Sequence, residues 1–216
     1  GGVPDGLVGV TNFIVTEDSP LSPGSPYART KYLVEMILED FTRASAMKVL
    51  SLRYFNPIGT DPKLRSGQQL EKPSHVLAKL LEAWSKGETF TVTGVEWPTR
   101  DGSGIRDFIH VWDLAQAHVA ALEGFDKATT NSSYEVFNIG TGNGVTVKEL
   151  AASFEAISGD ALNVQFGPPR PGDVAGVYTV SSKAKDVLGW EAKLTEQEAV
   201  RDAIAWLPVR KEMLGY

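Results

Sequence analysis

The sequence contains no cysteine among its 216 residues, so it forms no disulfide bond and offers no thiolate as a nucleophile or metal ligand. It has only three histidines, which are not spaced as metal ligands, so we expect no metal site. No run of about 18 apolar residues occurs, which argues against a membrane-spanning segment. Positive charge is not in excess either. The formal net charge is −6, which argues against a nucleic-acid or anionic-membrane partner. Together these absences are compatible with a cytoplasmic protein.

What is present is the composition of an ordinary globular protein, with 42% hydrophobic and 22% charged residues. A chain of this length holds one large domain or two small ones. The first six residues contain neither an initiator methionine nor a signal-peptide pattern, so we expect an internal segment of a longer polypeptide.

Helical and strand patterns alternate along the chain, which predicts an α/β fold. The expected helices cover residues 27–46, 74–85 and 113–125, a segment opened by the capping box Thr146–Glu149, and the C-terminal end. The expected strands cover residues 49–55, 90–93, 105–111, 134–139, 164–166 and 177–180. Asn56 and Pro57 are expected to end the first strand, and Asp113 to cap the third helix. Because the strand at 49–55 is typical of a central strand, its neighbours are needed to cover its apolar face.

A tyrosine and a lysine lie four residues apart where the first helix begins, at Tyr27 and Lys31. At this spacing both side chains lie on one helix face. A phenol is ordinarily a weak acid with a pKa of about 10, but a neighbouring ammonium group stabilises the phenolate. Such a pair can exchange protons with a sugar or alcohol hydroxyl. The alternative is an exposed helical pair without a chemical role.

Two arginines, Arg106 and Arg170, each lie near glycines and an aspartate. Guanidinium groups suit a diphosphate and would offset most of its charge, while Asp173 can accept hydrogen bonds from ribose hydroxyls. The alternative is a pair of surface ion pairs, with Asp107 and Asp173 as the partners.

The segment Gly140–Gly144 follows an expected strand and precedes a helix, as a dinucleotide-binding loop does. The fingerprint requires a third glycine where this chain has Val145, and no acidic ribose partner is evident, although Asp160 lies in range. We therefore expect a tight strand-to-helix turn.

Six motifs occur in a fixed order, at residues 25–31, 52–59, 101–115, 137–144, 170–173 and 182–190. Together they resemble the UDP-galactose 4-epimerases, which belong to the extended short-chain dehydrogenases/reductases. The resemblance covers nearly all of the chain from about Glu17 onward. It implies the C-terminal part of an NAD-binding Rossmann fold plus a small mixed α/β substrate domain. Residues 1–58 would be the remnant of the Rossmann domain that carries Tyr27 and Lys31. Residues 59–216 would be mainly the UDP-sugar-binding domain, with some strands and helices that return to the Rossmann domain.

The activity implied by the resemblance is NAD-dependent interconversion of UDP-glucose and UDP-galactose through a 4-keto sugar, as part of galactose metabolism. The glycine-rich turn that seats the NAD pyrophosphate is missing from this sequence, so the resemblance implies that NAD is held mostly by a preceding portion. It also implies a homodimer for the full-length protein. Two alternatives remain: a short protein that binds a nucleotide sugar without chemistry, and a related epimerase or decarboxylase acting on another UDP-sugar.

The resemblance also implies roles for individual residues. Tyr27 would be the acid/base, with Lys31 as its electrostatic and cofactor-orienting partner. The residues implied at the cofactor are Tyr27, Lys31 and Tyr54. The residues implied at the UDP-sugar are Asn56, His75, Val76, Thr91, Thr93, Arg106, Arg170, Asp173 and Val177.

Two of the implied positions, His75 and Val177, carry further expectations. His75 replaces an amide-bearing residue that is common in the family, and like His110 and His118 it is expected to be structural. Val177 stands where the family carries a side chain that bounds the sugar pocket. A valine there leaves room for an N-acetyl group, unless neighbouring side chains close the space.

Overall fold

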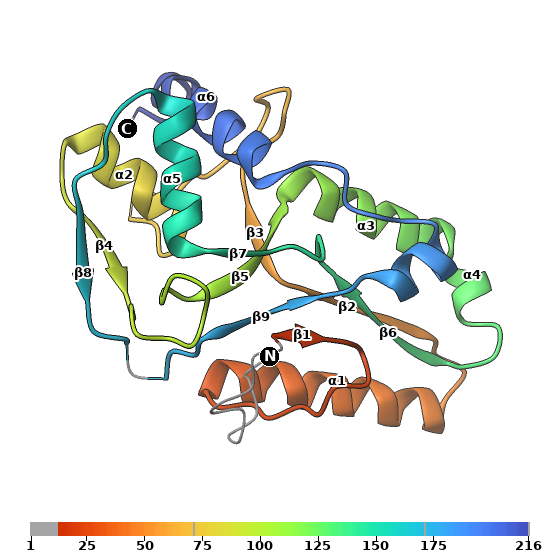
Figure 1. Ribbon diagram of the computed structural model, residues 1–216. Coiled ribbons are helices and arrows are strands. Elements are labelled where there is room, and N and C mark those ends of the chain that lie inside the picture. Colours follow the sequence, from red (N-terminus) through yellow and green to blue (C-terminus); the bar gives the residue numbers. More distant parts are fainter. Residues whose placement is uncertain (1–12, 71, 171, 216) are drawn as a thin grey trace.

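The computed structural model describes residues 13–70, 72–170 and 172–215 (Figure 1). The first six residues and Pro171 of the 170–173 motif lie outside these ranges. The helices are α1 (Pro26–Ala44), α2 (Val76–Lys86), α3 (Val111–Glu123), α4 (Phe125–Ala128), α5 (Val147–Ser158) and α6 (Glu196–Leu214), with a π-helical turn η1 (Ala184–Leu188). The strands are β1 (Ile14–Val15), β2 (Val49–Tyr54), β3 (Asn56–Ile58), β4 (Phe90–Thr93), β5 (Ile105–His110), β6 (Tyr134–Ile139), β7 (Gly144–Thr146), β8 (Val164–Gly167) and β9 (Gly176–Thr179). The predicted α/β class is confirmed.

The strands form three sheets, one of five strands and two of two strands each, in a curled mixed arrangement. The largest has the order β1-β9-β5-β3, with β7 antiparallel to β5, while β2 pairs with β6 and β4 pairs with β8, all in parallel. As predicted, the strand β2 ends before Asn56 and Pro57, with Tyr54 as its last residue. The backbone amide of Phe55 donates to Ile139, and the chain continues into β3 beside β5. Pro57 is tolerated because β3 is an edge strand of the five-stranded sheet. The N–H group that proline lacks therefore leaves no acceptor on a neighbouring strand without its hydrogen bond.

Helices cover the sheet in two groups. In Figure 1, α2, α5 and α6 gather near β4 and β8, and α3 and α4 lie near β6. The first group surrounds a core that contains the fully buried Leu80, Leu150, Phe154, Ala199 and Val200. The second group closes a smaller core whose buried members are Ile109, Ala117, Ala128, Phe137, Ile139, Ala184 and Trp190.

Local capping sets where the helices begin. Ser25 caps α1 by accepting a hydrogen bond from the amide of Ala28, and Pro26 occupies the first turn. The predicted capping box of Thr146 and Glu149 is confirmed at the start of α5. The assignment of Asp113 as a helix cap is wrong.

The helix α3 begins two residues earlier than predicted, and His110 is its cap. The ring nitrogen Nδ1 of His110 accepts a hydrogen bond from the amide of Trp112, 3.0 Å away. The Asp113 carboxylate is buried and accepts instead from the amides of Lys193 and Leu194, at 2.8 and 2.7 Å. Asp113 therefore fixes the segment that follows η1.

One face of α1 is apolar and uncovered. Leu33, Val34, Ile37 and Phe41 are each more than half exposed, and Met36 is 44% exposed. The neighbouring strand β2 has no fully buried residue, although a central strand of a parallel sheet ordinarily has several. The uncovered apolar side chains therefore lie on α1, whereas the strand for which an uncovered face was predicted is mostly half-buried. Within the described residues, no helix combines the length and apolar character needed to cross a bilayer.

Candidate functional site

The Tyr27 and Lys31 side chains lie next to each other at the start of α1. The ammonium nitrogen of Lys31 is 5.5 Å from the centroid of the Tyr27 ring, and Tyr27 is 72% exposed. The two residues are one turn apart, as the sequence predicts, because Ser25 and Pro26 start the helix immediately before Tyr27. A phenol and an ammonium group thus lie together at the exposed start of α1.

Tyr54 and Asn56 lie on either side of the point where β2 passes into β3. Tyr54 is half-exposed, and its ring lies tilted against that of His118, with centroids 6.4 Å apart. Asn56 pairs with Phe108 of β5, two residues beyond Arg106. The chain therefore connects the C-terminal end of β2, where Tyr54 lies, to β3, which pairs with β5 and so lies beside Arg106.

Arg106 forms the best-defined polar contact of the site. Its guanidinium group donates to Asp173 Oδ1 at 3.0 Å, and each of these two side chains keeps less than a quarter of its surface exposed. Burial lowers the pKa of Arg106, the Asp173 carboxylate opposes this change, and the positive charge of Arg170 adds to it. The backbone amide of Asp173 donates to the carbonyl oxygen of Arg170 at 2.9 Å, so Arg170 also lies beside the aspartate that pairs with Arg106.

The alternative of surface ion pairs named Asp107 and Asp173 as partners of the arginines. Asp173 does pair with Arg106. Among the described residues no arginine pairs with Asp107, so the alternative is wrong for this aspartate. The Asp107 carboxylate is fully buried and accepts hydrogen bonds from the amides of Thr141, Gly142 and Thr179 and from the Thr141 hydroxyl. Burial raises the pKa of Asp107, and these donors oppose the change. Asp107 thereby ties the turn after β6 to β9. The turn that begins at Gly140 is observed, but it leads into the strand β7 and not directly into a helix as expected.

Asp160, which lies in range of that turn along the sequence, has a structural contact elsewhere. It accepts a hydrogen bond from the indole Nε1 of Trp84 at 3.0 Å.

The remaining predicted substrate residues lie on β4, α2 and β9. Along β4 the side chains alternate, with Phe90 and Val92 in the core and Thr91 and Thr93 on the half-buried face. The Thr91 hydroxyl accepts a hydrogen bond from Gln165 of β8 at 2.7 Å. The partner of Thr93 in the ladder is Gly167, three residues before Arg170.

The N-terminus of α2 carries His75 and Val76. His75 is the exposed residue preceding the helix and makes no side-chain capping hydrogen bond, and Val76 is half-buried. Val177 of β9 pairs directly with Arg106 of β5.

The structure thus brings Arg106, Arg170, Asp173 and Val177 together at one junction, where β8 leads into β9 beside β5. No hydrogen bond or ion pair links this junction to Tyr27 or Lys31 within the part of the chain that the structure describes. In Figure 1 the connection from β8 to β9 and the helix α1 both lie in the lower part of the molecule. The described residues also contain no group of three or more potential metal ligands.

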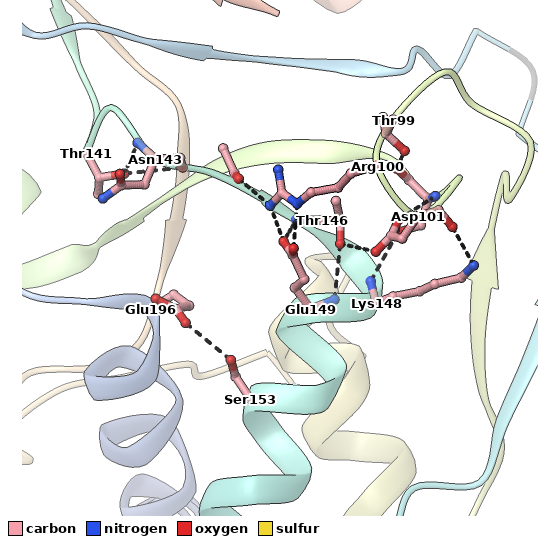
Figure 2. A network of polar contacts seen from close by, with 12 residues as sticks. Thr99, Arg100, Asp101, Thr141, Asn143, Thr146, Lys148, Glu149, Ser153 and Glu196 are labelled. Atoms are coloured by element: carbon pink, nitrogen blue, oxygen red, sulfur yellow. Dashed lines mark hydrogen bonds and ion pairs between the residues drawn. The ribbon is translucent and has the colours of Figure 1, made fainter.

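The sequence analysis missed a polar network at the N-terminus of α5, shown in Figure 2. The Arg100 guanidinium binds both carboxylate oxygens of Glu149 and the carbonyl of Gly144. The Asp101 carboxylate accepts from the Thr146 hydroxyl. The capping box was recognisable from the sequence, but the attachment of the 94–104 loop to it was not. The network fixes the loop that joins β4 to β5, and hence the two strands that carry Thr91, Thr93 and Arg106.

Comparisons with known proteins agree with this architecture. The family model described as "NAD dependent epimerase/dehydratase family" matches residues 7–140. The UDP-glucose 4-epimerase of Bacillus subtilis (strain 168) is 40% identical over 195 residues, which are 89% of this chain and 57% of that protein. The chain therefore spans a little over half the length of this relative.

Two solved structures show the same fold. The UDP-glucose 4-epimerase of Bifidobacterium longum in complex with NAD+ and UDP superposes with a TM-score of 0.84 at 34% identity, covering 92% of this chain and 59% of that one. The enzyme of Stenotrophomonas maltophila, with bound NAD and formylated UDP-arabinopyranose, gives a TM-score of 0.85 at 32% identity with the same coverage. The match of the family model to more than half of the sequence shows that the chain belongs to the NAD dependent epimerase/dehydratase family.

Proposed function

We propose that this chain is the C-terminal part of a UDP-hexose 4-epimerase that interconverts UDP-glucose and UDP-galactose. The observation that carries the proposal is the Tyr27–Lys31 pair, an exposed phenol beside an ammonium group at the start of α1. The relative from Bacillus subtilis is a UDP-glucose 4-epimerase at 40% identity, which supports this substrate class. The division into a Rossmann remnant at 1–58 and a substrate domain at 59–216 is part of the same proposal.

The residues present fit one end of an NAD molecule. Tyr27, Lys31 and the half-exposed Tyr54 offer two hydroxyls and a cation that could meet ribose hydroxyls and the nicotinamide. The glycine-rich turn at residues 140–144 has Val145 where the fingerprint requires a glycine, and the described residues contain no turn that matches the fingerprint for the pyrophosphate. The rest of the cofactor would therefore be bound by the N-terminal portion of a longer polypeptide. The chemistry supplied by the bound cofactor is removal of a hydride from the sugar and its return.

In this mechanism Tyr27 takes the proton of the sugar 4-hydroxyl and later gives it back. Lys31 favours the proton transfer because its positive charge stabilises the phenolate form of Tyr27. The proposed substrate-binding residues hold the nucleotide end of the molecule while the sugar turns over as its 4-keto form.

The diphosphate would lie against the positive region formed by Arg170 and Arg106, with Asn56 nearby. Asp173 would accept hydrogen bonds from the ribose, and the half-buried face of β4 with Thr91 and Thr93 would line the base. Because Arg106 and Asp173 already contact each other, the binding elements for phosphate and ribose are held in a fixed relation.

His75 and Val76 would complete the nucleotide site from the N-terminus of α2. Val177, next to Arg106 in the ladder, would bound the sugar pocket. Its small side chain supports the acceptance of N-acetylated UDP-hexoses alongside UDP-glucose and UDP-galactose.

The uncovered apolar side chains of α1 support a homodimer of the full-length protein, since burying such side chains stabilises association. A role in galactose metabolism and a cytoplasmic location belong to the same proposal.

The test is to incubate the full-length protein, and its Tyr27→Phe variant, with UDP-galactose and NAD, and to measure UDP-glucose by chromatography. We expect conversion by the wild type and a turnover lower by about 10²–10⁴-fold in the variant. Binding of UDP without any conversion would favour the alternative of a non-catalytic nucleotide-sugar-binding protein.

A further inference from the structure

A cavity of about 870 Å³ lies between α2, the C-terminal half of α6 and the segment 57–68. The two helices lie near each other in the upper left of Figure 1. The wall of the cavity is mostly apolar and includes Leu77, Leu81, Trp112, Ala203, Trp206 and Leu207. Pockets that bind small molecules measure about 300–1,000 Å³ and are lined mainly by apolar side chains, so this cavity has the size and character of a ligand site.

The cavity is separate from the proposed nucleotide-sugar site. Of the residues proposed to contact the cofactor or the substrate, only His75 lines it. The helix α2 contributes the lining residues Leu77, Ala78, Leu81, Glu82, Ser85 and Lys86. These recur at helical spacing and therefore share one face of α2, to which Val76 of the proposed nucleotide site does not belong. A ligand in the cavity would thus contact α2 from its own side.

The segment that closes the cavity is fastened to α6. The indole Nε1 of Trp206 donates to the carbonyl oxygen of Gln68 at 3.0 Å, and Arg210 Nη2 donates to that of Leu70 at 3.0 Å. Gly67 crosses so near the Thr60 hydroxyl and the Trp206 ring that a Cβ atom there would clash with both. These contacts hold the segment in place, so the wall of the cavity is already formed.

The Thr60 hydroxyl is a polar group of this wall that its own chain does not satisfy. Thr60 is only 1% exposed, and it lines the cavity. Its Oγ1 atom has no hydrogen-bond partner among the described residues. A buried hydroxyl without a partner costs free energy, and a hydroxyl can both donate and accept. A ligand oxygen beside Thr60 would therefore gain a hydrogen bond without breaking one.

The charges at the cavity favour an anion. The charged residues that line it are Asp61, Glu82, Lys86, Arg210 and Lys211. Glu82 pairs with Lys86 at 2.7 Å, and Asp61 pairs with Arg65. Both carboxylates therefore have cationic partners, whereas the exposed ammonium group of Lys211 makes no ion pair within the part of the chain that the structure describes. A single negative charge on a ligand would be attracted to Lys211.

We propose that this cavity binds a small amphipathic carboxylate. The carboxylate lies at Lys211, and the apolar body lies against Trp206 and the leucines of α2. A hydroxyl or carbonyl oxygen on the body of the ligand pairs with the Thr60 hydroxyl. The inference goes beyond the proposed function and does not depend on it, because only His75 belongs to both sites.

The test uses three probes of equal chain length, ω-hydroxydecanoate, decanoate and decanediol. Their binding to the full-length protein is measured by calorimetry, with UDP and NAD present at saturation so that the probes stay out of the nucleotide sites. Decanoate lacks the hydroxyl, and we expect it to bind about threefold to tenfold more weakly than ω-hydroxydecanoate, the range of one hydrogen bond. The diol lacks the charge and should bind about twofold to fivefold more weakly.

Two variants assign these differences to single residues. Thr60→Val keeps the shape of the side chain and breaks no hydrogen bond of the hydroxyl known within the described residues, so it should fold. It should bind both carboxylates equally, at the affinity of decanoate for wild type. Lys211→Ala should weaken the carboxylates by about twofold to fivefold and leave the diol unchanged. Lys48→Ala, at an exposed lysine that does not line the cavity, is the matched control.

A third variant fills the cavity. Ala78 is half-buried and lines the cavity from α2, so Ala78→Phe should abolish the binding of all three probes. Ala205→Phe adds the same ring at an exposed position of α6 that does not line the cavity, and it should bind the probes as wild type does. Melting temperatures near that of wild type would show that both variants fold.

Several results would overturn the proposal. Equal binding of ω-hydroxydecanoate by wild type and Ala78→Phe would show that the probe binds elsewhere, and equal affinity of wild type for the two carboxylates would overturn the role of Thr60. If no probe binds and Ala78→Phe instead changes the molecular mass measured by light scattering, the cavity is a surface for a second copy. None of these results bears on the conversion of UDP-galactose, so this inference and the proposed function fail separately.

Discussion

Replacing Thr146 with valine tests whether the network at the start of α5 fixes the 94–104 loop. Thr146 is fully buried, and its hydroxyl accepts a hydrogen bond from the Glu149 amide at 3.1 Å. The same hydroxyl donates to Asp101 Oδ2 (Figure 2). Valine has nearly the same shape but can do neither, so the variant removes both interactions without leaving a cavity.

The magnitude follows from these two contacts. Loss of a helix N-cap costs about 1 kcal/mol. Loss of the hydrogen bond from Thr146 to Asp101 Oδ2, a charged acceptor, costs roughly 1.5–3 kcal/mol more, while Ser103 still donates to Oδ1. We therefore expect Thr146→Val to lower the free energy of unfolding by about 3 kcal/mol in total. Thr146→Ser, which keeps the hydroxyl, should recover most of this loss.

Thr195 provides the matched control. It caps α6 with the same capping box, formed with Glu198, but it is exposed and has no third partner like Asp101. In urea denaturation of the full-length protein followed by tryptophan fluorescence, Thr195→Val should cost only about 1 kcal/mol. Equal losses in the two variants would refute the argument that the loop is fastened through Thr146.

The dependence on pH gives a further check on the same network. Burial by itself would raise the pKa of Asp101, but hydrogen bonds from Thr146 and Ser103 and the charge of Lys148 outweigh it and hold the pKa below its ordinary value of 3.8. A carboxylate with a lowered pKa in the folded state adds stability above its unfolded pKa and loses it as the pH falls through the folded value. The difference between wild type and Thr146→Val should therefore be full above a pH of about 4 and shrink below it. A difference that is constant down to a pH of about 2 would argue against this.

Three further predictions concern chemistry, specificity and packing. Tyr27→Phe should leave the dissociation constant of UDP within about twofold of wild type while turnover collapses, so a large loss of UDP binding would contradict its role as a proton-transfer group. Val177→Tyr should abolish turnover of UDP-N-acetylglucosamine and spare UDP-glucose, and equal loss of both substrates would show that Val177 does not bound the pocket. Asp113→Ala should lower the free energy of unfolding by about 3 kcal/mol, because the partly buried amides of Lys193 and Leu194 lose a charged acceptor, and a loss below about 1 kcal/mol would contradict that packing.

Much of the fold could be predicted from local patterns. The bounds of β4 and β6 agree with the prediction at both ends, because alternating or continuous apolar residues are flanked by clear turn signals. The capping box at Thr146 was found for the same reason, since its two members lie three residues apart. Signals that act within one turn or one strand are readable from the sequence.

What could not be predicted depends on contacts between distant segments. Asp113 is the better capping residue by preference, yet its carboxylate binds amides 80 and 81 residues away and His110 caps the helix instead. Gly176 leaves room for the guanidinium of Arg106, which lies 70 positions earlier. The sequence marked Arg106 as a cation near glycines, but only the structure shows that its guanidinium donates to Asp173.

The most direct test of the central claim is the fate of a deuterium atom placed at C4 of UDP-galactose. The full-length protein and NAD would be incubated with this substrate in ordinary water, and the product examined by mass spectrometry and NMR. If the C4 hydrogen leaves as a hydride and returns while Tyr27 handles only the hydroxyl proton, UDP-glucose will form with the deuterium retained at C4. Loss of the deuterium to water, or no UDP-glucose at all, would contradict the account.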